Sequence, residues 1–157
     1  MTKVVVRAAT ATDDAFVAAS FRNMWRDIGI ADADIVDDPE GRILAFLERG
    51  RAEAELTGAI AELDGIAIGC AVAQRFAGLY PDILRPQLRK YGYVWGVYVQ
   101  PTHRRGGLGR RLTQACVDAL KARGCTHVLL HAAPMGKGVY ERMGFAPSNE
   151  MKLPLSL

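Results

Sequence analysis

The sequence has few cysteines, little net charge and no long apolar run, and each shortage excludes a class of protein. Its 157 residues include three cysteines, Cys70, Cys116 and Cys125, an odd number without the spacing of metal ligands. We therefore expect reduced thiols, no metal site and a cytoplasmic location. No apolar run is long enough to cross a bilayer, and the first ten residues lack the apolar core of a signal peptide. A membrane protein is therefore not expected.

The charge balance argues against polyanionic partners. Lysine and arginine total 20 and aspartate and glutamate total 17, so the formal net charge is only +3. A domain that depends on nucleic acid or on an acidic membrane surface usually carries a larger excess. Half of the residues are hydrophobic and 24% are charged. This composition predicts a single folded domain over residues 1–157 with a sizeable core.

The hydrophobic pattern changes period along the chain and predicts mixed α/β structure. Asp38-Pro39 is typical of a helix start, and Asp64-Gly65 between two apolar runs is typical of a hairpin. The expected strands cover residues 4–7, 57–63, 66–74, 93–100, 126–131 and part of 145–155. The expected helices begin near residues 10–12, 39, 106 and 137. Strand, helix and strand over 93–131 form a parallel crossover, so the sheet is expected to be mostly antiparallel with one parallel pair.

The segment QPTHRRGGLGRRL, residues 100–112, is a basic, glycine-rich turn between an expected strand and an expected helix. The first amides of a helix have no partner within it, and the helix dipole adds partial positive charge there. Glycines allow a ligand to approach the backbone closely. The turn therefore predicts a phosphate site. Neither G-x-x-x-x-G-K-[ST] nor G-x-G-x-x-G is present, which argues against the common ATP and dinucleotide loops.

What stands in the turn is R-x-x-G-x-G, which resembles the acetyl-CoA-binding motif of the GCN5-related N-acetyltransferases, the GNAT family. Residues 139–145, VYERMGF, look like that family's Y-x-x-x-G-F segment, and residues 131–136 resemble the connection before it. The close match covers residues 94–146. The resemblance implies the GNAT-type fold, a mixed, mostly antiparallel central sheet flanked by helices, in which the parallel strand pair splays apart. It also implies transfer of acetyl from acetyl-CoA, as cosubstrate, directly to a primary amine of a small molecule or peptide.

The resemblance assigns residues to the cosubstrate. The backbone of the strand would hold the pantetheine arm, and the turn would hold the pyrophosphate on amides from Arg105 to Arg110. The implied cofactor-binding residues are Val97, Tyr98, Val99, Arg104, Arg105, Gly106, Gly107, Leu108, Gly109 and Arg110. A backbone amide near Val97 would contact the thioester carbonyl. Tyr140 matches the family's tyrosine that protonates the departing thiolate. The alternative role for Tyr140 is that of an aromatic residue of the core.

The general base is not assigned by the resemblance, because the strand at 93–98 carries no acid where many relatives have a glutamate. Glu62, Asp82, His131 and Glu150 are candidates by residue type. His131 ends the strand that enters the active region, although an imidazole that only caps a strand end is the competing reading. The connection at 132–138 also lacks the asparagine that many members have. Lys137 in this connection either meets a phosphate of CoA or is an exposed lysine.

Three functions compete at this stage. The first is an N-acetyltransferase, and the second is a catalytically silent acyl-CoA-binding module that regulates another process. The third, a nucleic-acid-binding domain, is disfavoured by the small net charge. Aromatic and basic residues between 75 and 95 either border an acceptor pocket or form a packed loop with solvated charges: Arg75, Tyr80, Arg85, Arg89, Lys90, Tyr91, Tyr93 and Trp95. Homodimers are common in the family and are an open alternative for this chain.

Overall fold

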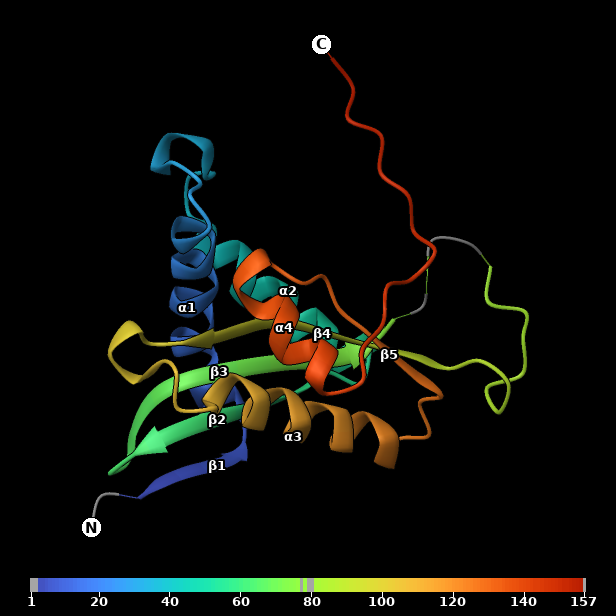
Figure 1. Cartoon of the computed structure of the whole chain (residues 1–157), viewed down its shortest axis with the longest axis horizontal. Coiled ribbons are helices and arrows are strands. Elements are labelled where there is room, and N and C mark those ends of the chain that lie inside the picture. Colours follow the sequence, from blue (N-terminus) through green and yellow to red (C-terminus); the bar gives the residue numbers. More distant parts are fainter. Residues whose placement is uncertain (1–2, 77, 79–80, 157) are drawn as a thin grey trace.

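The computed structural model describes residues 3–76, 78 and 81–156, and these form one sheet with helices on both faces (Figure 1). Within the described residues, five strands stand in the order β1-β2-β3-β4-β5, which is also their order along the chain. The strands β1 (Val4–Ala8), β2 (Thr57–Leu63), β3 (Ile66–Arg75) and β4 (Tyr91–Val99) pair antiparallel. The short β5 (His127–Leu129) runs parallel to β4. The predicted mostly antiparallel sheet with one parallel pair is confirmed.

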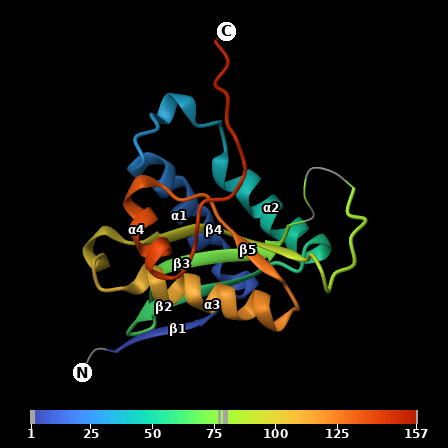
Figure 2. The same cartoon turned by 45° about the vertical axis from the view of Figure 1, so that its right-hand side comes forward.

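The helices divide between the two faces of the sheet (Figure 2). α1 (Asp14–Asp27) and α2 (Pro39–Glu53) cover one face, and α3 (Leu108–Ala122) covers the other, with α4 (Pro134–Arg142) beside it. Short 3-10 turns at Ala11–Asp13, Asp32–Asp34 and Pro101–His103 connect these elements. The two faces therefore carry separate apolar clusters, one below α3 and one below α1 and α2.

The α3 cluster shows how the sequence pattern produces the packing. Leu112, Cys116 and Leu120 recur every four residues, so they lie on one side of α3, and each is at most 1% exposed. They pack on alternate residues of the central strands, such as Ala59 and Ala61 of β2. The small alanine side chains let the helix lie close to the sheet.

The predicted signals at Asp38-Pro39 and Asp64-Gly65 are confirmed. The Asp38 carboxylate accepts a hydrogen bond from the Gly41 amide at 3.0 Å, and Pro39 is the first residue of α2. Asp64 and Gly65 form the turn between β2 and β3, whose ladder runs up to Leu63 paired with Ile66. Local capping and turn chemistry therefore fix these two boundaries.

The final strand expected within residues 145–155 is wrong, because residues 145–156 contain no helix or strand. This segment leaves the body as an extended tail (Figure 1). Pro147 and Pro154 have no amide hydrogen to give to a ladder, which works against pairing over the whole length.

Other elements differ from the predictions only at their ends: β4 begins two residues early at Tyr91, β5 stops at Leu129, and α4 begins at Pro134.

No helix among the described residues is both long enough and apolar enough to cross a membrane.

Candidate active site

A bulge interrupts β4 in the middle of the sheet. Val72 of β3 pairs with Trp95, and Cys70 pairs with Tyr98, so Gly96 and Val97 together face one residue of β3. Gly96 has a φ of +61°, a conformation that glycine adopts without the cost of a Cβ. A bulge leaves one residue outside the regular pairing and turns the strand. It therefore puts the backbone around Val97 in an irregular position. This bulge was not predicted from the sequence, although a glycine inside an expected strand is a signal that could have indicated it.

β4 and β5 remain paired over only part of their length. The ladder joins Tyr91, Gly92 and Tyr93 to the three residues of β5 and ends at Leu129. Beyond that point β4 continues to Val99, and no further partner is recorded on this side among the described residues. The segment at 97–99, expected to hold the pantetheine arm, lies in this unpaired part. An edge of this kind can accept an extended ligand as an added strand.

The glycine-rich turn lies at the end of the same strand. After the 3-10 turn at Pro101–His103, Arg105 and Gly107 take φ angles of +66° and +75°, and α3 begins at Leu108. The first intrahelical bond runs from the Arg111 amide to the Gly107 carbonyl at 3.1 Å, so the amides before it are available to a ligand. A Cβ built at Gly107 or Gly109 would meet nothing within 4 Å. The predicted anion site therefore has an open approach to the helix start.

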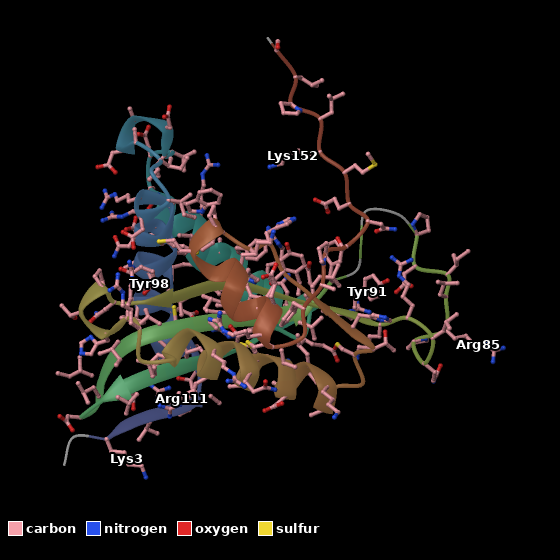
Figure 3. All side chains as sticks on the ribbon, viewed as in Figure 1. Lys3, Arg85, Tyr91, Tyr98, Arg111 and Lys152 are labelled. Carbon is pink, nitrogen blue, oxygen red and sulfur yellow. The ribbon has the colours of Figure 1, made fainter. Side chains whose placement is uncertain are left out.

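The four arginines of the turn have different roles in the structure. The Nε of Arg104 donates to the Val99 carbonyl at 2.8 Å, and its guanidinium pairs with Asp27 at the end of α1. Arg111 donates to the Val4 carbonyl at 3.2 Å and ties α3 to β1 (Figure 3). Arg105 and Arg110 are exposed. The side chain of Arg104 thus holds the strand, the turn and α1 together, whereas the side chains of Arg105 and Arg110 lie at the surface of the turn.

Tyr140 of α4 lies against α3. Its ring packs edge-on against Phe145, with centroids 5.9 Å apart, and a Cβ at Gly136 would come within 2.9 Å of the ring. Burial raises the pKa of the Tyr140 phenol, and the Thr113 hydroxyl acts in the opposite direction. Thr113 is itself fully buried and donates to the Gly109 carbonyl at 2.8 Å. The phenol is therefore neutral, half-buried and connected through one residue to the first turn of α3.

The candidate bases fall into two groups. Glu62 pairs with Arg7 at 2.6 Å on β2, away from the gap between β4 and β5, and Asp82 is exposed in the loop before β4. His131 and Glu150, in contrast, come together, since Nε2 of His131 lies 3.3 Å from Oε1 of Glu150. The other ring nitrogen, Nδ1, lies 2.6 Å from the hydroxyl of Tyr93. Sequence reasoning did not find this connection, because the three residues come from separate segments.

The aromatic residues that were expected either to border an acceptor pocket or to belong to a packed loop lie in different parts of the structure. Trp95 lies between the rings of Phe21 and Phe46, with centroid distances of 5.3 and 5.4 Å, on the face of α1 and α2. Tyr91 lies at the opposite end of β4 from Tyr98 (Figure 3). Tyr80 lies outside the described residues. The tail, β5, α3 and the loop before β4 enclose an open hollow of about 810 Å³ near Tyr91, with Glu150 in its lining.

The basic residues of this region are partly engaged. Lys90 pairs with Glu55 at 3.2 Å and donates to the Arg123 carbonyl at 2.7 Å. Arg89 stacks 4.4 Å over the ring of Tyr91, and Arg85 lies at the surface of the loop (Figure 3). Lys137 is exposed and lies 3.9 Å from Glu141. Of the two alternatives, an acceptor pocket and a packed loop, the packed loop is therefore correct for Lys90.

The thiols are unsuited to covalent catalysis. Burial raises the pKa of both Cys70 and Cys116 to about 12, so neither forms an appreciable amount of thiolate near neutral pH. Burial also raises the pKa of Cys125. Among the residues that the structure describes, no three His, Cys, Asp or Glu side chains are grouped as metal ligands would be.

An open strand edge, the start of α3 and the half-buried phenol of Tyr140 are thus the features that these elements present. A model of the acetyltransferase (GNAT) family matches residues 18–145, and the chain belongs to this family.

Two curated relatives match the chain over shorter stretches. A glucosamine 6-phosphate N-acetyltransferase of Trypanosoma brucei brucei is 32% identical over 68 residues, which are 43% of this chain and 46% of that protein. The chloroplastic serotonin N-acetyltransferase 2 of Oryza sativa subsp. japonica is 38% identical over 53 residues, 34% of this chain and 26% of that protein. The match thus spans less than half the length of either relative.

The fold has close structural counterparts. A predicted acetyltransferase of Clostridium acetobutylicum, solved with acetyl-CoA, superimposes with a TM-score of 0.82 at 23% identity and covers 98% of this chain and 96% of that one. This likeness shows the fold alone.

Proposed function

We propose that this protein is an N-acetyltransferase that transfers acetyl from acetyl-CoA to a primary amine of a small molecule or peptide. One observation carries the proposal: β4 leaves its parallel partner at Tyr93 and leads directly into an open, glycine-rich helix start. A strand edge and an anion site in this order match an extended molecule with a pyrophosphate at one end. Membership of the acetyltransferase family and the acetyl-CoA bound to the structural counterpart support the same cosubstrate.

The turn residues hold the phosphates in this proposal. Amides from Arg105 to Arg110 receive the pyrophosphate at the positive end of α3, while the side chains of Arg105 and Arg110 add charge around it. Gly106, Gly107 and Gly109 keep the backbone accessible, and buried Leu108 anchors the helix start to the core. Arg104 acts through its side chain as a support, because that side chain is already bonded to Val99 and Asp27.

The strand residues bind and polarise the thioester. The backbone of Val97, Tyr98 and Val99 bonds the pantetheine arm as an added strand would. In this proposal an amide near Val97, next to the bulge, contacts the acetyl carbonyl, where a fixed donor stabilises the negative charge that develops during attack. Tyr140 donates its proton to the departing sulfur, and its raised pKa keeps that proton in place beforehand.

The transfer is direct, without an acyl-enzyme. Cys70 and Cys116 are buried, and the pKa of each thiol is about 12, so neither is an acceptor for the acetyl group. The rate then comes from holding the amine against a polarised thioester and from proton transfers at each end.

The relatives point to small amines as acceptors. Their names give an amino sugar phosphate in one case and an aromatic amine in the other. Trp95, Phe21 and Phe46 form an aromatic group on the α1 and α2 face, with Phe46 exposed, which suits a cationic or aromatic amine.

A silent acyl-CoA-binding module is the competing function, and turnover distinguishes the two. We expect release of CoA thiol, followed with DTNB, when acetyl-CoA is supplied with members of a panel of amino sugars, polyamines, aromatic amines, amino acids and peptide N-termini. Calorimetry with acetyl-CoA is run in parallel. Tight binding without amine-dependent thiol release across the panel would show that the module reading is correct.

We also propose that two copies of the chain associate. Met151, Leu153 and Leu155 alternate along the tail and are 78–95% exposed, and β5 is an edge strand. Alternating apolar residues are the pattern of a strand with one buried face, and an unpaired edge is a template for such a strand. We expect light scattering after size exclusion to give twice the chain mass, and Leu153→Asp to give the monomer. A wild-type monomer at tens of micromolar would contradict this.

A further inference from the structure

Three polar side chains from separate segments of the chain form one hydrogen-bonded chain. The hydroxyl of Tyr93 on β4 lies 2.6 Å from Nδ1 of His131, which follows β5. Nε2 of His131 lies 3.3 Å from Oε1 of Glu150 in the tail. The rings of Tyr93 and His131 also contact each other, with centroids 5.6 Å apart. Residues 93, 131 and 150 meet only because the strand, the crossover and the tail converge here.

The chain lies where the two parallel strands separate. Tyr93 and Leu129 form the last rung of the β4–β5 ladder, and His131 is two residues beyond that rung. Val94 belongs to the apolar cluster below α3, whereas Trp95 belongs to the cluster below α1 and α2. Side chains alternate along a strand, so Tyr93 is on the Trp95 face. It therefore borders the gap from the face opposite α3, against which Tyr140 packs.

The hydrogen bonds define which nitrogen carries the proton. An ionised carboxylate only accepts hydrogen bonds, so the Nε2–H group of His131 donates a hydrogen bond to Glu150. Neutral imidazole then has its lone pair on Nδ1, and this lone pair accepts the hydroxyl proton of Tyr93. The Tyr93 oxygen keeps its own lone pairs and can accept a proton from a third group. The arrangement can thus pass a proton from the gap to the imidazole.

We propose that Tyr93 and His131, oriented by Glu150, remove the proton from the incoming ammonium before it attacks the thioester. This inference rests on the proposed acetyl transfer. One N–H bond of the ammonium breaks and its proton bonds to the Tyr93 oxygen, while the electron pair stays on the amine. The former Tyr93 proton bonds to Nδ1 of His131. The products are a neutral amine and an imidazolium beside the Glu150 carboxylate.

The surroundings of the chain suit this role. Burial raises the pKa of Tyr93 and the negative charge of Glu150 raises it further, so the phenol stays protonated and passes protons on. The side chain of His131 is 79% exposed, so the imidazolium can release its proton to water. Proton removal then occurs on one face of the gap, and Tyr140 returns a proton to sulfur on the other.

The test compares amines of different basicity. Tyr93→Phe and His131→Gln should each lower kcat/KM for a basic alkylamine substrate by about 100-fold, within the usual range for loss of a positioned base. A weakly basic amine, such as a hydrazide that is already neutral at the assay pH, should lose less than about fivefold. Glu150→Gln should show the same split with a smaller loss, because Glu150 only positions His131. Acetyl-CoA affinity should not change in any variant.

The neighbouring Tyr91 and His127 supply matched controls. Their rings form a similar pair, with centroids 5.1 Å apart, two residues before Tyr93 and four before His131. Both residues line the hollow of about 810 Å³, so Tyr91→Phe and His127→Gln should change the rates with the two amines by the same factor, without the difference expected for Tyr93→Phe and His131→Gln. Equal losses with both amines in Tyr93→Phe and His131→Gln, or full activity of these two variants, would overturn the relay and leave the acetyltransferase proposal intact. A wild-type protein that acetylates no amine would overturn both.

Discussion

At the scale of single residues, Tyr140 is either the proton donor to the leaving thiolate or a structural aromatic residue. One substitution distinguishes these two roles. Tyr140→Phe keeps the ring and its contacts with Phe145 and Gly136, so the fold should be unchanged. If the hydroxyl protonates the leaving thiolate, it matters in the transition state and little in the ground state. We expect kcat to fall by roughly 10²–10⁴-fold with unchanged acetyl-CoA affinity. Steady-state kinetics and calorimetry measure the two quantities.

The outcome for Tyr140→Phe is interpreted against Tyr91→Phe, which removes the hydroxyl of a tyrosine that has no part in the proposed proton transfers. Full kcat in Tyr140→Phe with a good amine would make Tyr140 a structural aromatic residue. Catalysis would then depend on polarisation by the backbone and on proximity.

A second residue-scale prediction concerns Asp13, which has no proposed part in the chemistry. Two hydrogen bonds from Arg7, at 2.8 and 2.9 Å, lower the pKa of this carboxyl to about 2, and the Thr10 amide adds to the shift. A lowered pKa stabilises the fold above the unfolded-state pKa near 4, and this stability disappears as the pH falls through about 2. Asp13→Asn should therefore cost about 1–2 kcal/mol at pH 7 and progressively less between pH 4 and pH 2.

Urea unfolding at several pH values measures this dependence. Asp32→Asn is the control, because its side chain is 70% exposed in an ion pair with Arg26 and such pairs contribute under about 1 kcal/mol. A loss of stability in Asp13→Asn that did not change with pH would show that the ionisation of Asp13 does not contribute to it.

At the scale of elements, the start of α3 decides whether the phosphate site is correctly placed. A Cβ at position 109 would meet nothing within 4 Å, so Gly109→Val should fold while its side chain obstructs a phosphate at the amides. We expect acetyl-CoA affinity to fall at least about tenfold, or about 1.4 kcal/mol. Gly107→Val should lose affinity too, but its φ of +75° adds backbone strain and makes it the less direct test.

The control for Gly109→Val is Ala122→Val, an exposed position at the opposite end of the same helix. Calorimetry on both variants, with circular dichroism to confirm folding, separates obstruction from general damage. Unchanged affinity in a folded Gly109→Val protein would place the phosphates elsewhere.

Elements that depend on local chemistry were predictable from the sequence, whereas those that depend on distant contacts were not. The helix start at Asp38-Pro39 and the turn at Asp64-Gly65 are set by neighbouring residues, and both predictions are confirmed. The expected strand within 145–155 is wrong, since its apolar alternation does not reveal whether an edge is available to pair with it. The chain from Tyr93 to Glu150 was unpredictable for a similar reason, because its members are 38 and 19 residues apart.

At the scale of the whole molecule, cosubstrate binding should be visible as stability. A ligand that binds only the folded state stabilises it by RT ln(1 + [L]/Kd), about 2.7 kcal/mol at one hundred times Kd. For a domain of this size, that corresponds to a rise in Tm of roughly 5–10 °C. Acetyl-CoA at that excess should produce the rise in Tm in wild type and in Tyr140→Phe, because this variant is expected to impair the catalytic step and not acetyl-CoA binding. Gly109→Val, at the same concentration, should gain at least about 1 kcal/mol less. Equal rises in all three proteins, measured by differential scanning calorimetry, would contradict the assignment of the helix start to the phosphates while leaving acetyl-CoA as the ligand.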